Sequence, residues 1–323
     1  MKTKLTSTRL AGMRKCPRLH YWRYELGLAR VRQATPLRFG SLFHKGLELR
    51  HSMAGQLAED ALASILQAVL AEYDAVPDWA DRTEWTVERE TLGALLSGHI
   101  WRYGQDDLQF VAVEQAFELP LVNPDSGALS RTFSLAGKID AIVRLPDGRL
   151  AVLEYKTAGE DIAPDSEYWL RLRCDGQISL YVLAARAMGY DVATVLYDVT
   201  RKPTIRLRQK ETPEAFGQRL LADIAERPGF YYQRREVPRL EDDLVQFRAE
   251  LWQQAQQLLD LRRRASHLTD PATAHFRNVG RMTCGYCDFA DLCLSGARVD
   301  PASPPAGYQV LPDVNPELCA EGA

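Results

Sequence analysis

The sequence contains no run of about 18 apolar residues, and its first residues, from Met1 to Leu5, carry no apolar segment of the kind that a secretory leader needs. We therefore expect no membrane-spanning helix, no signal peptide and no membrane partner. The chain also lacks the G-x4-G-K-[ST] loop of ATP-driven motors, and it shows no repeat with a period of roughly 20 to 50 residues. These absences predict a cytoplasmic protein without a motor of its own.

Disulfides are not expected, because in a reducing cytoplasm the six cysteines need another role. Two of them, Cys174 in a predicted helix and Cys319 in the tail, are interpreted as ordinary residues. Of the 323 residues, 46% are hydrophobic and 26% are charged, which is close to the globular average and excludes a disordered or fibrous protein. This length predicts one large domain or two small ones with a substantial core.

The net charge of −3 hides a strong asymmetry along the chain. Residues 1–50 hold 12 Lys and Arg against 2 Asp and Glu, residues 51–125 hold 3 against 14, and residues 201–264 hold 14 against 10. Basic stretches attract polyanions such as nucleic acid whatever the net charge is. The alternative is that the first two stretches form helical faces of opposite charge that attract each other.

Hydrophobic periodicity predicts an α/β protein. A first helix is expected to be capped by Ser7 or Thr8 and to run toward Cys16. The other predicted helices cover about residues 39–73 with a break near Gly55, 83–103, 166–188, 213–226 and 240–265. The predicted strands cover residues 110–121, 132–145, 150–157, 193–200, 204–208 and 230–237, and the tail from Asp300 is expected to be irregular.

The first three predicted strands form an antiparallel meander, because Pro146-Asp147-Gly148 is a strong turn signal between the second and the third. A helix and a fourth strand follow. The core order is therefore helix, three strands, helix, strand.

Three cysteines form the pattern C-x2-C-x5-C at Cys284, Cys287 and Cys293. Three thiols within ten residues are typical of metal ligands, but they are one short of the usual four. Cys16 is the better candidate for the fourth ligand and His275 the weaker one, and a ligand at Cys16 would join the two chain ends. Thiolates suit either zinc or an iron–sulfur cluster, and inert buried thiols are the plain alternative.

Glu154 and Lys156 form the pattern E-x-K on a predicted strand, so their side chains share a face while Tyr155 points the other way. Asp140 lies on the preceding strand, and apolar neighbours surround both acids, which is costly unless each carboxylate binds a partner. A divalent cation suits two carboxylates and the Tyr155 carbonyl, and it can bind a phosphate oxygen and lower the pKa of a bound water. Lys156 can then orient that water or stabilise the developing charge. The alternative is a salt bridge between Lys156 and Asp140.

Two further groups fit this arrangement. His44 lies in a predicted helix from which a fifth group can reach the cation, although a lone histidine is more often a surface residue. Gln177 and Tyr181 are spaced i, i+4 on the helix after the Glu–Lys strand, with Arg173 one turn earlier. Such a stripe suits a phosphate backbone and a stacked base, and a solvated helix face is the alternative.

In this order the motifs resemble the PD-(D/E)XK nuclease superfamily. More narrowly, they resemble RecB-family exonucleases that carry an iron–sulfur cluster, such as the AddB-type nuclease domain and the CRISPR-associated exonuclease of the same build. The resemblance covers roughly residues 5–296 and rests on the order and spacing of all its elements. The matching elements are Ser7-Thr8-Arg9-Leu10 leading to Cys16-Pro17, Gly40-x3-His44, Gly137-Lys-Ile-Asp140, Glu154-Tyr-Lys156, Gln177-x3-Tyr181 and the C-terminal cysteines.

The resemblance implies a role for each matching residue. His44, Asp140, Glu154 and the Tyr155 carbonyl would hold Mg²⁺ or Mn²⁺, and Lys156 would be the catalytic lysine alongside the two acids. Gln177 and Tyr181, with Arg173 beside them, would hold DNA or position the active site. The resemblance also favours a structural [4Fe-4S] cluster over zinc. Its four ligands would be Cys16, Cys284, Cys287 and Cys293.

The resemblance also implies a restriction-endonuclease-like core with helical additions, in a single domain over residues 1–300. Its parts would be a basic segment with the first cluster cysteine (1–38), a helical region (39–108), the nuclease core (109–200), an Arg-rich extension with the cluster loop (201–296) and an irregular tail (301–323). Two features depart from the common pattern. Glu154 replaces the Asp that begins some versions of the second acidic motif, and residues 201–265 exceed the minimal core.

The implied function is a metal-dependent DNA exonuclease that acts on single-stranded DNA or DNA ends in recombination, repair or phage-type processing. The alternatives are a nuclease subunit or DNA-binding module that is active only with a helicase or CRISPR-type partner, and a nuclease that acts on RNA. In the first case the helicase would be another chain.

Overall fold

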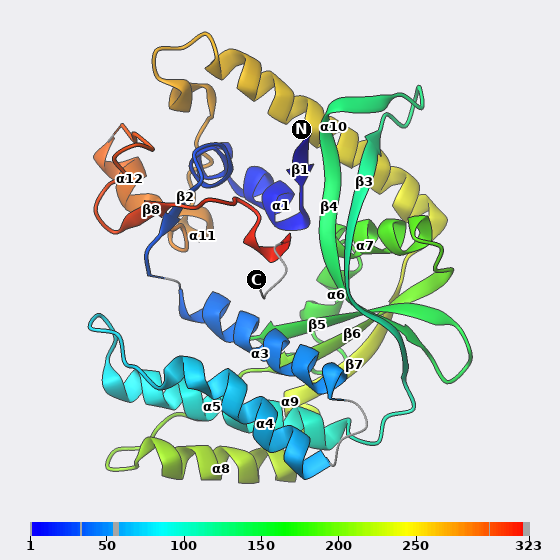
Figure 1. The fold of residues 1–323 in the computed structure, drawn as a ribbon, viewed down its shortest axis with the longest axis vertical. Coiled ribbons are helices and arrows are strands. Elements are labelled where there is room, and N and C mark those ends of the chain that lie inside the picture. Colours follow the sequence, from blue (N-terminus) through cyan, green and yellow to red (C-terminus); the bar gives the residue numbers. More distant parts are fainter. Residues whose placement is uncertain (1, 33, 54–57, 297, 319–323) are drawn as a thin grey trace.

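A mixed β-sheet forms the centre of the molecule in the computed structural model, which describes residues 2–32, 34–53, 58–296 and 298–318 (Figure 1). In the described part of the chain the sheet has the strand order β1-β4-β5-β6-β7, and β3 pairs with the other edge of β4. Its strands are β1 (Thr3–Leu5), β3 (Gln109–Val122), β4 (Leu129–Arg144), β5 (Leu150–Ala158), β6 (Val192–Arg201) and β7 (Tyr232–Pro238).

Strand pairing confirms the predicted core order. β3, β4 and β5 are antiparallel neighbours, and β6 lies parallel to β5 after a helical crossover. The turn between β4 and β5 closes at Gly148, whose φ of +89° is one that glycine adopts without strain. Two pairings lie outside that core. β1 runs parallel to β4, and β7 runs antiparallel to β6.

Helices cover both faces of this sheet. The first layer packs on one hydrophobic cluster and contains α3 (Thr35–Ser52), α4 (Ala58–Leu70), α5 (Arg82–Arg102) and α8 (Pro213–Glu226). The second layer packs on the other cluster and contains α1 (Ser7–Lys15), α7 (Gly176–Ala187) and α10 (Glu241–Ala265). The short helices are α2 (Pro17–His20), α6 (Glu167–Leu172), α9 (Pro228–Tyr231), α11 (Arg281–Cys284) and α12 (Ala290–Ser295).

The alternation of β5 decides which residues face which layer. Leu153 and Tyr155 belong to the cluster under α3 and α5, whereas Val152 belongs to the cluster under α7 and α10. Glu154 and Lys156 therefore point toward the α7 layer, while Tyr155 points toward α3. This confirms the predicted separation of their side chains.

Several predicted elements differ from the structure. The helix predicted over 166–188 is two helices, α6 and α7, because Asp175 caps α7 by accepting a hydrogen bond from the Gln177 backbone N–H (2.9 Å). The strand predicted over 204–208 is not formed. Ile205 and Leu207 are partly buried, but Arg208 donates its N–H to Glu211 (2.8 Å) rather than to a strand.

The ends of other elements also differ. Thr6, one residue before the predicted position, caps α1 by accepting from the Arg9 N–H (3.2 Å). The predicted break near Gly55 lies outside the described residues, between α3 and α4. Within the tail that the sequence leaves irregular, β8 (Tyr308–Val310) pairs with β2 (Leu28–Arg30).

The two ends of the chain pack together, as Figure 1 shows for β2, β8 and α12. The Arg18 N–H donates to the Phe276 carbonyl (3.2 Å), and Arg30 Nε donates to the Asp288 carbonyl (2.7 Å). The rings of Trp22 and Phe289 lie 5.6 Å apart in a small separate core. The segment that carries Cys16 and the segment with the C-terminal cysteines are thus neighbours.

Opposite charges pair between the basic and the acidic stretches of the sequence. Arg38 binds Glu88 at 2.5 Å, Lys4 lies 3.3 Å from Glu118, and Lys45 lies 3.8 Å from Glu72. Mutual attraction of the two stretches, the alternative to nucleic-acid binding, thus accounts for part of the asymmetry. Among the described residues, no helix is long and apolar enough to cross a membrane.

Candidate functional site

The acidic site begins where β4 and β5 part. Their pairing extends to Ala141 opposite Leu153, and beyond it the Asp140 carboxylate accepts the Tyr155 backbone N–H through Oδ2 (2.9 Å). A buried N–H needs an acceptor, and here a side chain replaces the strand carbonyl. The sequence therefore uses Asp140 both to end the pairing and to place a carboxylate beside the Tyr155 peptide.

A second group of side chains extends from β5 to α7. Lys156 Nζ lies 2.6 Å from Glu154 Oε1 and donates to Gln177 Oε1 at 2.7 Å. Gln177 in turn donates to the Tyr181 hydroxyl (3.0 Å), as their i, i+4 spacing predicts. Lys156 thus forms its ion pair with Glu154. The alternative ion pair, between Lys156 and Asp140, is not found among the described residues.

His44 reaches the site from α3. Its Nδ1 lies 3.6 Å from Asp140 Oδ1, so the predicted approach of this helix to the acidic strands is confirmed. One oxygen of Glu154, Oε2, is buried and has no hydrogen-bond partner among the described residues. A buried carboxylate oxygen without a partner is costly and marks a place where a ligand would be stabilising.

The two carboxyl groups have opposite electrostatic environments. Burial raises the pKa of Glu154 to about 7, although the charge of Lys156 acts against it. Burial also acts to raise the pKa of Asp140, but the charge of His44 and the N–H of Tyr155 outweigh it and hold that pKa below its usual value. Desolvation opposes charge on His44 and Lys156, yet the neighbouring acids raise the pKa of both.

Sequence reasoning missed Glu114. It lies on β3 between Val113 and Gln115, which pair with Ala141 and Ile139, and its φ of +51° is uncommon for a residue with a side chain. It forms an ion pair with Lys138, while burial and then the charge of Asp140 raise its pKa. An isolated Glu in a strand carries no signal of this backbone conformation.

The DNA-binding candidates are placed differently from one another. Gln177 and Tyr181 lie on α7, and their contacts lead to Lys156. Arg173 is not on that helix face, because it lies exposed in the turn between α6 and α7, where its carbonyl accepts from Arg239 (2.8 Å). The prediction that Arg173 shares one helix face with Gln177 and Tyr181 is therefore wrong. Asp175-Gly176, a cap signal, was the feature that could have revealed the break.

Cys16 lies close to the C-terminal segment that carries the other three candidate cysteines. Cys16 is buried and accepts a hydrogen bond from the Asn278 N–H (3.5 Å), while burial, with a contribution from Cys16, raises the pKa of Cys287. His275, the weaker candidate, is buried against the ring of Tyr21 (4.6 Å). Cys174 is exposed, and Cys319 lies outside the described residues.

Metal-binding geometry is incomplete at both places. In the part of the chain that the structure describes, no three His, Cys, Asp or Glu side chains converge closely enough to hold a metal ion. The acidic site offers the His44–Asp140 pair with Glu154 nearby, and the chain ends offer Cys16 beside the segment of Cys287. A cation at the acidic site would therefore depend on the Tyr155 carbonyl or the substrate for further oxygens.

Comparison with known proteins gives one family. The family model described as the PD-(D/E)XK nuclease superfamily matches residues 4–294. No curated protein sequence matches the chain. Among solved structures, "Crystal structure of SSO0001" is 14% identical, with a TM-score of 0.36, and the match covers 92% of this chain and 88% of that one. At that score the likeness adds nothing to the family match.

Proposed function

The chain belongs to the PD-(D/E)XK nuclease superfamily, and on this premise we propose that it is a metal-dependent DNA exonuclease that acts on single-stranded DNA or DNA ends. The observation that supports the proposal most is that Asp140, Glu154 and Lys156 lie together where β4 and β5 part. Asp140 accepts the N–H of Tyr155, the residue between Glu154 and Lys156, and Lys156 donates to Glu154. We further propose that its role lies in recombination, repair or phage-type DNA processing.

The types of donor at the acidic site suit a hard divalent cation such as Mg²⁺ or Mn²⁺. Asp140, Glu154 and the Tyr155 carbonyl would supply oxygen ligands, and His44 would supply a nitrogen. The clearest candidate is Glu154 Oε2, which has no hydrogen-bond partner within the described ranges. When bound, such an ion would stabilise charge on a phosphate and make a water molecule more acidic.

Lys156 is proposed as the catalytic lysine. Its ammonium has three N–H groups, and those directed at Glu154 and Gln177 leave one for a phosphate oxygen of DNA or for the attacking water. Gln177 and Tyr181 would then position this lysine. Arg173, exposed in the turn before α7, is proposed to contact the DNA backbone.

A [4Fe-4S] cluster at Cys16, Cys284, Cys287 and Cys293 is proposed as a structural group. Its support is the burial of Cys16 against the C-terminal segment and the presence of all four as free cysteines. The thiols would hold the cluster, which would join the chain ends by covalent bonds to iron. Zinc is the alternative that metal analysis would distinguish.

The proposed activity is tested with anaerobically purified protein and Mg²⁺ or Mn²⁺. The substrates are linear single-stranded DNA labelled at either end, circular single-stranded DNA, and linear RNA. We expect metal-dependent loss of linear DNA only, at least 100-fold slower in Asp140→Ala, Glu154→Ala and Lys156→Ala, as loss of catalytic groups predicts. All three variants should keep the circular dichroism of the parent. Cutting of circles would indicate an endonuclease. Cutting of RNA alone would exclude the DNA assignment, and no cutting of any substrate would favour a partner-dependent subunit.

A further inference from the structure

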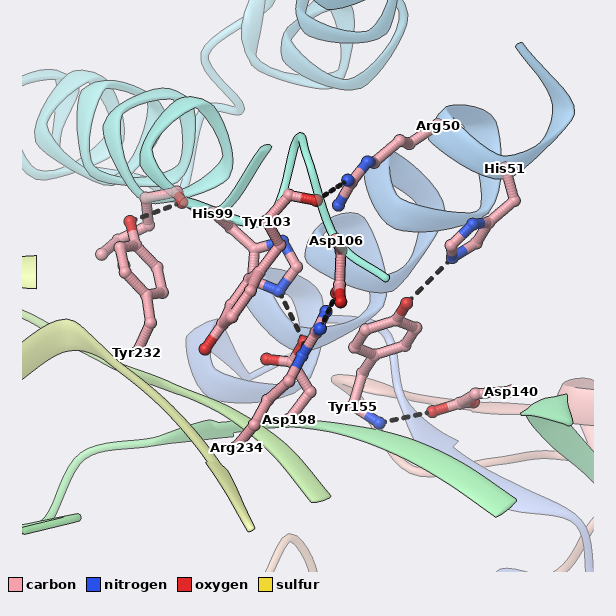
Figure 2. A network of polar contacts seen from close by, with 11 residues as sticks. Arg50, His51, His99, Tyr103, Asp106, Asp140, Tyr155, Asp198, Tyr232 and Arg234 are labelled. Carbon is pink, nitrogen blue, oxygen red and sulfur yellow. Dashed lines mark hydrogen bonds and ion pairs between the residues drawn. The ribbon is translucent and has the colours of Figure 1, made fainter. Parts of the chain in front are cut away.

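A polar network, buried at His99, Tyr155 and Asp198 and partly exposed elsewhere, lies behind the acidic site on the α3 and α5 side of the sheet (Figure 2). It joins helices, strands and one loop, and the proposed chemistry uses none of its side chains. Its members are Arg50 and His51 of α3, His99 of α5, Tyr103 and Asp106 after α5, Tyr155 of β5, Asp198 of β6 and Arg234 of β7.

Tyr155 connects this network to the acidic site. Its backbone N–H donates to Asp140 (2.9 Å), and its hydroxyl forms a hydrogen bond with His51 Nε2 (2.9 Å), as Figure 2 shows. One residue thus contacts a proposed metal ligand through its peptide and α3 through its side chain. The carbonyl of the same residue is a proposed metal ligand. Any rotation of the Tyr155 backbone would therefore move both this carbonyl and the N–H that binds Asp140.

The same contact fixes the position of α3. His44 and His51 are seven residues apart, which is about two helical turns, so they lie on one side of the helix. His44 is held near Asp140 (3.6 Å) and His51 at Tyr155 (2.9 Å). With one contact to β4 and one to β5 along its axis, a slide or rotation of α3 over these two strands would break at least one of them.

The strands beyond Tyr155 are rigidly held as well. Asp198 lies opposite Tyr155 in the sheet and is fully buried, with its Oδ2 bound by His99 (3.0 Å) and by Arg234 (2.7 Å). Arg234 also stacks on the ring of Tyr103 (3.7 Å to the ring centre). A charge-assisted network in a buried region restricts the side chains that it joins. Tyr155 is itself buried and its ring lies 6.0 Å from that of His99, so its side chain has little room to move on this side.

We propose that Tyr155, through its side chain, and His51 are positioning residues that set the Tyr155 peptide and α3 in the geometry that metal binding requires. The inference rests on the proposed function, since it concerns the same site. It assigns a positioning role to the side chain of Tyr155, the middle residue of the E-x-K motif, in addition to the proposed role of its carbonyl as a metal ligand. Outer groups that orient ligands commonly change metal affinity by about 10- to 100-fold when they are removed.

The test compares two tyrosine-to-phenylalanine variants. Tyr155→Phe removes the bond to His51 but keeps the backbone carbonyl. Tyr232→Phe removes a buried bond of the same kind, from the hydroxyl to the Leu95 carbonyl (2.8 Å), in the same hydrophobic cluster. Free Mn²⁺ is titrated by electron paramagnetic resonance without DNA, and thermal unfolding is recorded for both. We expect the Mn²⁺ Kd to rise roughly tenfold in Tyr155→Phe and to stay at the parent value in Tyr232→Phe.

A second pair of variants tests His51. His51→Gln retains a hydrogen-bonding group and should keep more of the Mn²⁺ affinity than His51→Leu, which retains none. If Tyr155→Phe binds Mn²⁺ like the parent while it loses stability, the hydroxyl is only a structural group and the inference is overturned. Equal affinity in His51→Gln and His51→Leu would also overturn it. If the parent itself binds no Mn²⁺, the proposed metal site fails, and the positioning role fails with it.

Discussion

Asp140 and Glu154 are neighbours on adjacent strands, yet their surroundings push their pKa values in opposite directions. Asp140 receives a peptide N–H and lies beside His44, so its charged form is stabilised. Glu154 is more deeply buried, and its Oε2 has no hydrogen-bond partner among the described residues; burial raises its pKa to about 7. Carboxyl pairs that titrate apart are common at functional sites, where each acid has its own role. A residue list alone does not contain this difference.

At the same scale, His20 links stability to pH. It is fully buried and accepts from Arg9 Nε (3.3 Å), and burial followed by the charge of Arg9 lowers its pKa to about 3. Between about pH 6.5 and 3 the unfolded chain therefore binds a proton that the folded chain does not, so stability falls as the pH falls. From pH 7 to pH 5 this histidine should cost about 2 kcal/mol.

The matched variant is His20→Gln, whose amide oxygen can still accept from Arg9. Urea unfolding at pH 7 and pH 5 measures the loss for each protein. We expect the parent to lose about 2 kcal/mol more than the variant. Equal losses would show that His20 is not the responsible group, and that other buried histidines such as His275, whose pKa burial lowers to about 4, carry the effect.

At the scale of elements, the sequence predicts most helices and strands but not where they are interrupted. The meander, α5, α10 and the strand β6 were predicted from their hydrophobic patterns and from one clear turn at Gly148. The break before α7 was missed because the cap signal of Asp175-Gly176 was not used to divide the predicted helix. The strand predicted at residues 204–208 was wrong because burial of Ile205 and Leu207 needs no strand partner. β1 is too short for any period to appear.

Asp175 should matter more than its loop position implies. Its Oδ1 caps α7 (2.9 Å from the Gln177 N), and its Oδ2 accepts from the buried Tyr197 hydroxyl (3.2 Å). Loss of a cap costs about 1 kcal/mol, and an unsatisfied hydroxyl costs about 1 to 3 kcal/mol more. We expect Asp175→Ala to lower the unfolding free energy by roughly 2 to 4 kcal/mol and to slow cleavage several-fold, because Gln177 holds Lys156.

Asp175→Asn is the control, since its amide oxygen can still cap the helix. Denaturant unfolding and initial cleavage rates are measured for both variants. The Asn variant should lie much closer to the parent in both. If Ala and Asn behave alike, the cap does not determine the position of α7.

At the scale of the whole molecule, the two ends of the chain are held by contacts that no local pattern predicts. Glu25 accepts from Arg9 (2.7 Å) and from Arg262 of α10 (2.9 Å), which joins residues 237 positions apart. The sequence predicted a connection between the ends only through its cysteines, with Cys16 as the candidate fourth ligand. The proximity of Cys16 to the C-terminal segment agrees with that expectation, whereas convergence of the thiols on one metal is not shown by the described residues.

The cysteines offer the decisive test of this long-range connection. If Cys16 and Cys287 are ligands of one cluster, either substitution by Ala should remove the iron, the sulfide and the brown colour, even though the two residues are far apart in sequence. Exposed Cys174 is the matched control, and Cys174→Ala should keep the parent content. Iron, zinc and sulfide are measured after anaerobic purification, together with thermal unfolding.

Zinc without sulfide would show that the site binds zinc and not a cluster. A parent protein that contains no metal would show that the chain ends hold no metal site. Because metal binding to sites of this kind is coupled to folding, loss of metal in Cys16→Ala and Cys287→Ala should also lower the unfolding temperature, and the Cys174→Ala protein should unfold with the parent.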